Sequence, residues 1–377
     1  MYVSGVAVSK FGVSPKSYPE MMLEVIQQAL ADAEINPTEL DAIYISNNLA
    51  PHTQNQCHLA SVLAGYFPDL YLPIFGLEAA CAGGGVAIHQ ACVSLRAYER
   101  ILVVGVEKMS ESAPQDMLYF VAADADREFD QREGLVFPAG GALIASSYMQ
   151  KYGATTDDYA LVSYKNHQNG NLNPQAHFYG KNVSLEMIKE SKIICSPLRL
   201  FDCSANTDGA AAVILERQKR GKRAKKIIAS TLATNHVNFA QDKDPLDRKE
   251  VQKAAKKAFS QCGLLPKQIE FAEIHDGFTV IELLMMENLG LCPFGEGYKW
   301  IREGRTNLDG QFPVNPSGGL KACGHPVGAT GVRQVAEVVT QLRGEAGKRQ
   351  VERNNLGLAF NFGSLVGSCT VHILKND

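Results

Sequence analysis

Cys81 stands where a reactive thiol is expected. It precedes Ala82 and three consecutive glycines, and the apolar positions over 86–95 predict a helix that begins at this point. A thiol at a helix start faces unpaired amide N–H groups and the positive end of the helix dipole. Both favour the thiolate, which is the nucleophilic form of cysteine. The alternative interpretation is a small buried hydrophobic residue, as most free cysteines are.

Two histidines have settings that suit such a thiol. His275 comes directly after a predicted strand, and His325 lies between Gly324 and Pro326 at the start of a second glycine-rich helix. A neutral imidazole can take the proton of Cys81, and a second one can donate a hydrogen bond to a carbonyl oxygen that gains negative charge. Either histidine could instead be a structural residue with satisfied hydrogen bonds.

The elements that would position these residues form two similar series. In the first half we expect, in order, a strand at 2–8, a helix at 22–33, a strand at 42–45, the Cys81 helix and a buried strand at 100–106. In the second half we expect a helix at 251–262, a strand at 271–274, the glycine-rich helix at 324–342 and a strand at 356–360. Such a repeat predicts pseudo-twofold packing that brings Cys81 and His325 together at the centre of an α/β fold.

The two series differ by an insertion. We expect an N-terminal half over 1–225 and a C-terminal half over 226–377, with a segment of about 110–195 inserted into the first. This segment is rich in polar and aromatic residues, and segments inserted into a regular scaffold commonly carry substrate recognition.

Composition excludes several classes of function. The chain has 377 residues and a net charge of −3, which argues against a large nucleic-acid interface. Its nine cysteines are odd in number and include no CxxC pair, so a reducing, cytoplasmic setting is expected. We recognise no signal peptide, membrane span, metal-binding spacing or nucleotide-binding fingerprint, and we expect neither a metal nor a resident cofactor.

Two motifs carry a family resemblance. The segments 313–319 and 324–331 resemble those of the thiolase family, and the similarity runs over nearly the whole chain. The segments 165–174, 197–204 and 275–278 resemble the branch related to sterol-carrier-protein thiolase, with its archaeal and bacterial relatives. We do not expect the carrier domain of that branch in this chain.

The resemblance implies a five-layer αβαβα fold and an acyl-CoA or acetyl-CoA substrate. It implies an acyl-enzyme on Cys81, activation by His325 and a thioester oxygen held by His275. The substrate- and CoA-binding positions that it implies are Ser204, Ser317, Gly318 and Ser364. The inserted segment would hold CoA, which is a substrate rather than a cofactor. A homodimer or a dimer of dimers is expected, as is a partner protein in a multienzyme complex.

Two departures concern the acid/base of the carbon–carbon step. Most thiolases carry a second cysteine near the C-terminus, and Phe362 stands at that place here. The sterol-carrier branch places a cysteine third in its histidine motif, where this chain has Gly277. Cys323, two residues before His325, is the candidate substitute; the alternative is a small packed residue.

The function expected from these residues is that of an acetyl-CoA acetyltransferase or 3-ketoacyl-CoA thiolase in lipid metabolism. One alternative keeps the acyl-enzyme but changes the acceptor, as in ketosynthase-like chemistry. Another is a non-catalytic thiolase-fold subunit that binds acyl-CoA.

Overall fold

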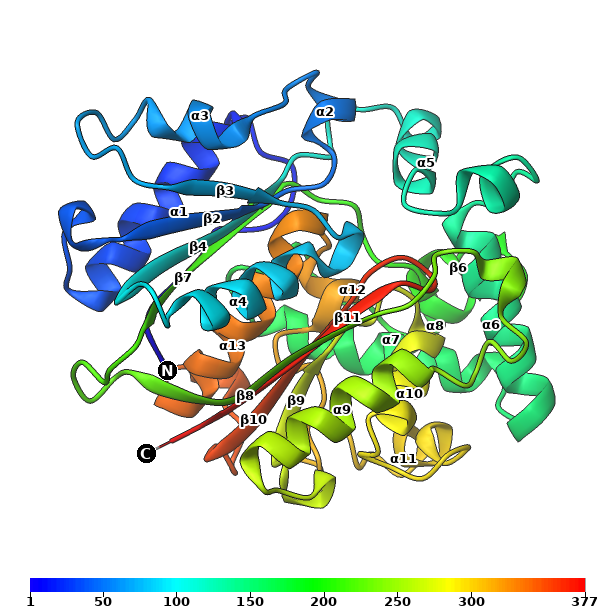
Figure 1. The fold of residues 1–377 in the computed structure, drawn as a ribbon. Helices are drawn as coiled ribbons and strands as arrows, with labels where there is room; N and C mark the ends of the chain where they lie inside the picture. Colours follow the sequence, from blue (N-terminus) through cyan, green and yellow to red (C-terminus); the bar gives the residue numbers. More distant parts are fainter. Residues whose placement is uncertain (377) are drawn as a thin grey trace.

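The computed structural model describes residues 1–376, whose nine main strands join in one mixed β-sheet that folds into two halves (Figure 1). The strand order is β3-β2-β4-β7-β1-β8-β11-β10-β9, and β1 and β8 pair only at Tyr2–Val3 with Lys225–Lys226. We therefore call β3-β2-β4-β7-β1 the first sheet and β8-β11-β10-β9 the second. The strands of the first sheet are β1 (Tyr2–Val8), β2 (Ala42–Ser46), β3 (Ile74–Leu77), β4 (Arg100–Glu107) and β7 (Gly209–Glu216). Those of the second are β8 (Lys225–Thr234), β9 (Phe271–Ile274), β10 (Leu356–Phe362) and β11 (Ser368–Lys375).

The second sheet repeats the order and the strand directions of the first. Strands β2 and β4 are parallel, and β7 runs antiparallel to both β4 and β1. In the same way β9 and β10 are parallel, and β11 runs antiparallel to both β10 and β8. A parallel bridge from Ala272 in β9 to Val314 takes the place that β3 holds beside β2. The repeated series of elements expected from the sequence is therefore present as a repeated topology.

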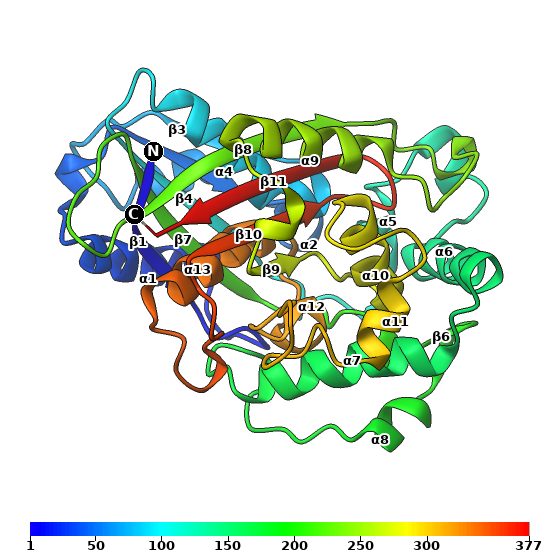
Figure 2. The same ribbon diagram turned by 90° about the horizontal axis from the view of Figure 1, so that it is seen from below.

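Helices lie on both sides of each sheet and complete five layers (Figures 1 and 2). Helix α1 (Tyr18–Ala33) packs against β1 and β7, and α9 (Lys249–Cys262) packs against β8 and β11. Helices α4 (Gly83–Ser94) and α13 (Thr330–Arg343) lie between the sheets and contact strands of both. The five-layer αβαβα architecture is confirmed.

The two central helices approach so closely because their first turns are built from glycine. A Cβ atom on Gly84 would lie 2.8 Å from the backbone nitrogen of Gly331, and one on Gly331 would lie 2.2 Å from that of Gly85. Any side chain at these positions would push the helices apart. The crossing brings the segments that carry Cys81 and His325 to the centre of the molecule.

The remaining helices belong mostly to the connections. Between β2 and β3 lie α2 (Ala50–Thr53) and α3 (Leu59–Ala64). Between β4 and β7 lie α5 (Pro114–Ala122), α6 (Phe137–Tyr152), α7 (Thr156–Asn171), α8 (Leu185–Lys189) and a small hairpin of β5 (Ile193–Cys195) and β6 (Leu198–Arg199). Between β9 and β10, ahead of α13, lie α10 (Thr279–Asn288), α11 (Gly297–Arg302) and α12 (Gly319–Cys323). Within residues 1–376, no helix combines the length and the apolar character needed to cross a membrane.

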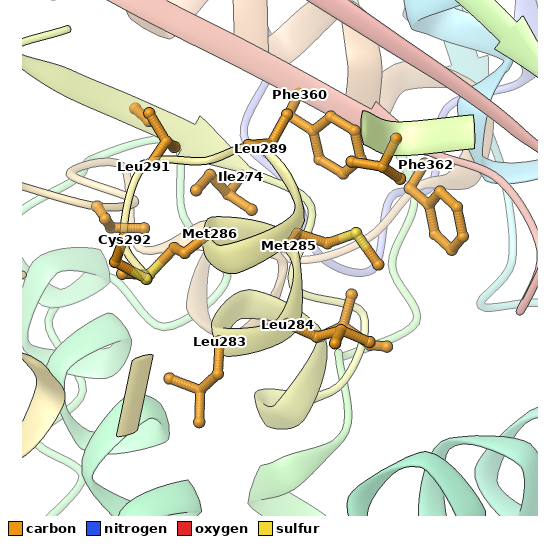
Figure 3. Close-up of a cluster of buried hydrophobic side chains, with 14 of the residues drawn as sticks. Ile274, Leu283, Leu284, Met285, Met286, Leu289, Leu291, Cys292, Phe360 and Phe362 are labelled. Atoms are coloured by element: carbon orange, nitrogen blue, oxygen red, sulfur yellow. The ribbon is translucent and has the colours of Figure 1, made fainter. Parts of the chain in front are cut away.

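Helix α10 packs its apolar side chains against the second sheet (Figure 3). Phe360 and Phe362 of β10 belong to this cluster together with Ile274 of β9. Because side chains alternate along a strand, the residue between the two phenylalanines, Asn361, points the other way, toward α4. The packing of α10 therefore fixes which side chain of β10 reaches the centre of the molecule.

Candidate active site

Cys81 and His325 are in hydrogen-bond contact at the meeting point of the two halves. Cys81 lies on the short 3₁₀ turn Ala80–Ala82 that leads into α4, and its Sγ is 3.3 Å from Nε2 of His325. The other ring nitrogen, Nδ1, is 2.7 Å from Oγ1 of Thr330. Thr330 donates its single hydroxyl hydrogen to the carbonyl oxygen of Pro326. Thr330 must therefore accept from Nδ1–H, which leaves the Nε2 lone pair facing the Cys81 thiol.

His275 reaches the same point with the opposite tautomer. Its backbone follows β9 directly, and Asn361 Nδ2 lies 3.2 Å from its Nδ1 and 2.9 Å from the carbonyl oxygen of Cys81. The orientation of the Asn361 amide is fixed, because the Gly85 N–H donates to its Oδ1. Asn361 thus donates to Nδ1 of His275, and the ring proton resides on Nε2. His275 presents a donor where His325 presents an acceptor.

Burial keeps all three groups neutral. It raises the pKa of the Cys81 thiol well above its usual range, and the charge of Asp124 raises it further. Burial also lowers the pKa of His325 to about 3, with Arg333 and Lys321 adding to the effect. The pKa of His275 is likewise lowered, by burial and by His325. The sequence-based expectation that the helix start would favour the thiolate is wrong, because loss of solvation outweighs the helix-start donors.

A buried network holds both histidines in place. Asp276, beside His275, accepts from the backbone N–H of Leu320 at 2.6 Å and from Asn166 Nδ2 at 2.9 Å. Lys321 donates to the carbonyl oxygen of Gly277 at 3.2 Å. These bonds tie the loop after β9 to α12, and α12 leads directly into the His325 segment.

The three side chains open into a cavity of about 400 Å³. Most of its wall is apolar and comes from α5, the start of α6 and the start of α10: Pro114, Met117, Leu118, Val121, Phe137, Pro138, Phe278 and Ile281. Ser204 and Ser364, two of the expected substrate-binding residues, also line it. Ser364 adopts a left-handed backbone conformation (φ 64°), and its N–H acts on the Cys81 sulfur to lower its pKa, against the larger effect of burial.

Ser317 and Gly318, two other expected substrate-binding residues, are absent from the cavity wall. Ser317 is fully buried and donates its hydroxyl to Glu273 at 2.8 Å, within an ion pair of Glu273 and Arg333. Gly318 has a φ of 102° and packs against the backbone of Gly170. Both residues shape the loop before α12, and neither lines this cavity.

Cys323 is also displaced from the reacting centre. Its Sγ lies 3.8 Å from Asn173 Nδ2, and it lines a different cavity beside Arg333 and Glu337. Burial raises the pKa of its thiol to about 12. Cys323 is neither among the side chains that converge at Cys81 nor part of the wall of the cavity at Cys81, so the geometry gives no support to the expectation that it replaces the missing acid/base.

Asn361 and Thr330 were missed from the sequence. The sequence comparison assigned the acid/base place near the C-terminus to Phe362, whereas the alternation of β10 turns Asn361 toward Cys81 and His275. Thr330 belongs to the motif that carries His325, five residues further on. The 3₁₀ turn Val327–Ala329 folds it back onto the ring. Side chains alternate along a strand, so the two phenylalanines of β10 could have indicated that Asn361 faces the opposite side.

The converging Sγ and ring nitrogens lie within 4.8 Å of one another, a spacing that a zinc ion could also accept. The hydrogen bonds argue otherwise. Nδ1 of His275 already accepts from Asn361 and its Nε2 carries the ring proton, so neither nitrogen offers a free lone pair to a metal. The arrangement places a thiol beside a ring nitrogen with a free lone pair, next to a second ring that carries its proton on Nε2.

Fold and site together define a thiol enzyme of the two-half α/β type. The family "Thiolase, N-terminal domain" matches residues 6–219, and "Thiolase C-terminal domain-like" matches residues 231–376. The chain belongs to the thiolase family. The expectation of a thiolase-type acyl-CoA acyltransferase is thereby confirmed for the class of enzyme.

Individual relatives are similar to this chain over nearly its full length. An acetyl-CoA acetyltransferase of Methanothermobacter thermautotrophicus is 38% identical over 99% of this chain and 98% of its own. Human sterol carrier protein 2 is 32% identical over all of this chain and 72% of its own. Among solved structures, an Ltp2-ChsH2(DUF35) aldolase has a TM-score of 0.85 at 23% identity, covering 100% of this chain and 97% of its own.

Proposed function

We propose that this protein is a thiolase of the acetyl-CoA acetyltransferase or 3-ketoacyl-CoA thiolase type that forms an acyl-enzyme on Cys81. The observation that carries the proposal is the 3.3 Å contact between Cys81 Sγ and a His325 ring whose lone pair is turned toward it by Thr330. Acetyl-CoA is the first substrate class to test, because the relative at 38% identity is named for it.

The acyl transfer proceeds from neutral groups. His325 takes the thiol proton as the Cys81 sulfur attacks the thioester carbonyl, so no free thiolate is exposed before the substrate arrives. The backbone N–H groups of Ser364 and Cys81, both beside the sulfur, stabilise the negative oxygen that forms. His325 then returns the proton to the departing CoA sulfur.

Intact-mass spectrometry after incubation with acetyl-CoA tests the proposal. We expect one acetyl adduct on the parent protein and none on Cys81→Ala. Cys203 lines the same cavity and serves as the matched control, so Cys203→Ala should label like the parent. An adduct that persists in Cys81→Ala would place the acyl group on another residue and refute the proposal.

A second candidate keeps the acyl-enzyme and changes the acceptor. It is favoured by Gly277 and Phe362, which stand where other thiolases carry an acid/base cysteine. Labelling of Cys81 without thiolysis of any 3-ketoacyl-CoA would support this ketosynthase-like acyltransferase. No labelling at all would support a non-catalytic subunit that binds acyl-CoA.

The proposal also includes the expectations on domain boundaries, CoA binding, cellular location and assembly. They are two halves at 1–225 and 226–377, a CoA-binding segment at about 110–195 and a role for Ser204 in CoA contact. All nine cysteines are unpaired, which supports a cytoplasmic, reducing location. A homodimer is supported by β3, an edge strand with the exposed side chain of Phe75. A partner protein is suggested by the name of the aldolase complex.

A further inference from the structure

The carbon–carbon step of a thiolase needs a base at the substrate α-carbon. Few side chains in the cavity could serve as that base. Four of the described side chains that line the cavity are titratable: Cys81, Cys203, His275 and His325. Cys81 carries the acyl group in the proposed function, on which this inference rests. The base must therefore come from the other three.

Cys203 and His275 are unsuited to the task. The thiol of Cys203 donates to the carbonyl oxygen of Arg199 at 3.6 Å, and burial raises its pKa to about 11. Its sulfur is not among the atoms that converge within 4.8 Å at the centre. His275 already carries its proton on Nε2, because Asn361 donates to Nδ1. It can stabilise an enolate oxygen as a donor, and it cannot accept the α-proton at that nitrogen.

His325 is the one remaining group with a free lone pair at the centre. Its Nδ1–H is held by Thr330 throughout, and its Nε2 lies 3.3 Å from Cys81 Sγ. Acylation removes the thiol hydrogen, and release of CoA removes the proton that Nε2 had taken. The same lone pair then faces the acyl-enzyme unoccupied.

We propose that His325 is the single base of both half-reactions. In the second half-reaction its Nε2 removes the α-proton of the incoming acetyl-CoA, and His275 Nε2–H bonds the enolate oxygen. The enolate carbon attacks the acyl carbonyl on Cys81, the new carbon–carbon bond forms, and the carbon–sulfur bond to Cys81 breaks. The Cys81 sulfur takes the proton back from His325. Acyl-enzyme and acetyl-CoA thus yield 3-ketoacyl-CoA and free thiol without another proton donor or acceptor.

Gly277 supplies the space that this geometry needs. A Cβ atom at Gly277 would lie 3.3 Å from Nε2 of His275. The absence of a side chain leaves room beside that N–H for the second thioester. The negative charge of the enolate would raise the pKa of His325 and favour its protonated imidazole, whereas burial lowers that pKa.

Deuterium exchange into acetyl-CoA separates this step from acylation. Cys81→Ala cannot be acylated at Cys81 but keeps His325, so in D₂O it should exchange the methyl protons of acetyl-CoA, as measured by mass spectrometry. Cys81→Ala/His325→Gln should lose this exchange by about 10² to 10⁴, the usual contribution of a general base. Cys81→Ala/Cys203→Ala should exchange like the single variant. Thermal melting and acetyl-CoA titration calorimetry verify that each variant is folded and binds.

Three results would overturn the proposal: exchange that survives His325→Gln, exchange that disappears with Cys203→Ala, or no exchange in Cys81→Ala while the parent condenses acetyl-CoA. A folded His325→Gln variant that no longer binds acetyl-CoA would assign His325 to binding and would also count against it. Failure of the proposed function has a different signature, which is the absence of an acetyl adduct on the parent.

Discussion

At the scale of residues, the two histidines of the site adopt opposite tautomers. Thr330 accepts from His325 Nδ1 and Asn361 donates to His275 Nδ1, so Nε2 of His325 offers a lone pair and Nε2 of His275 carries a proton. Neither partner is itself titratable in the physiological range. The roles of the two rings therefore do not depend on the ambient pH, provided that both rings stay neutral.

This arrangement predicts a flat pH profile for Cys81 acylation. The base form of His325 exists above its pKa of about 3 and is lost only as the pH falls through that value. The second-order rate of acetyl labelling should therefore stay constant from about pH 5 to pH 8, without the inflection near 6.5 of an ordinary histidine. The raised pKa of Cys81 likewise predicts no increase toward pH 8 from thiolate formation.

Quenched-flow labelling with mass-spectrometric readout measures this profile, and circular dichroism at each pH verifies the fold. A fall in rate centred near pH 6.5 would mean that His325 titrates like an exposed imidazole, and the neutral resting state would then be incorrect.

At the scale of elements, the site depends on how closely α4 and α13 cross. Cys81 and His325 are 244 positions apart in the chain and meet because Gly84, Gly85 and Gly331 remove side chains from the crossing. The cost of this packing is a requirement for glycine at three positions. Its benefit is a fixed distance between nucleophile and base, set by helices rather than by loops.

Gly84→Ala tests the crossing. The added methyl would lie 2.8 Å from the backbone nitrogens of Gly331 and Val332, neither of which can move without its helix. We expect the free energy of unfolding to fall by about 1–3 kcal/mol, as for other overpacked cores. Acetyl labelling of Cys81 should slow as well, because the helices separate.

Chemical denaturation measures the stability change. Gly65→Ala is the matched control, because its added methyl would meet no atom closer than 3.5 Å and its φ of −60° suits alanine. Equal stability and labelling in Gly84→Ala and the parent would show that α4 and α13 can accommodate the added methyl without separating. That result would contradict the prediction.

At the scale of the molecule, β3 is an edge strand with an exposed apolar side chain. It ends the first sheet, and its residue Phe75 is 42% exposed. The loop that follows β3 carries Cys81, so a partner subunit bound here would lie beside the catalytic turn. An edge strand with an apolar face is a ready site for pairing with a second copy.

The proposed homodimer therefore predicts a specific effect of Phe75→Asp. The parent should sediment as a dimer at micromolar concentration. The variant should shift to monomer, because a buried carboxylate without a partner opposes association. Leu143→Asp, at an exposed apolar position of α6, should remain dimeric. A monomeric parent, or a dimeric Phe75→Asp, would reject β3 as the interface.

The sequence by itself determined the class of fold, the family and the three converging side chains. Helical periodicity and buried strand runs are local signals, and a repeated series predicts that equivalent helix starts meet. That inference alone predicts that Cys81, His275 and His325 meet, as they do in the structure.

Only the tertiary structure decided what each of these groups does. Burial reversed the expected ionisation of Cys81, because solvation is a property of the packed molecule and not of a helix start. The direction of the Cys323 side chain and the partners of Ser317 depended on contacts with distant segments. The tautomers of the two histidines were set by Thr330 and Asn361. A hydrogen bond between residues far apart in the chain, such as that of Asn361 with His275, leaves no periodic trace in the sequence.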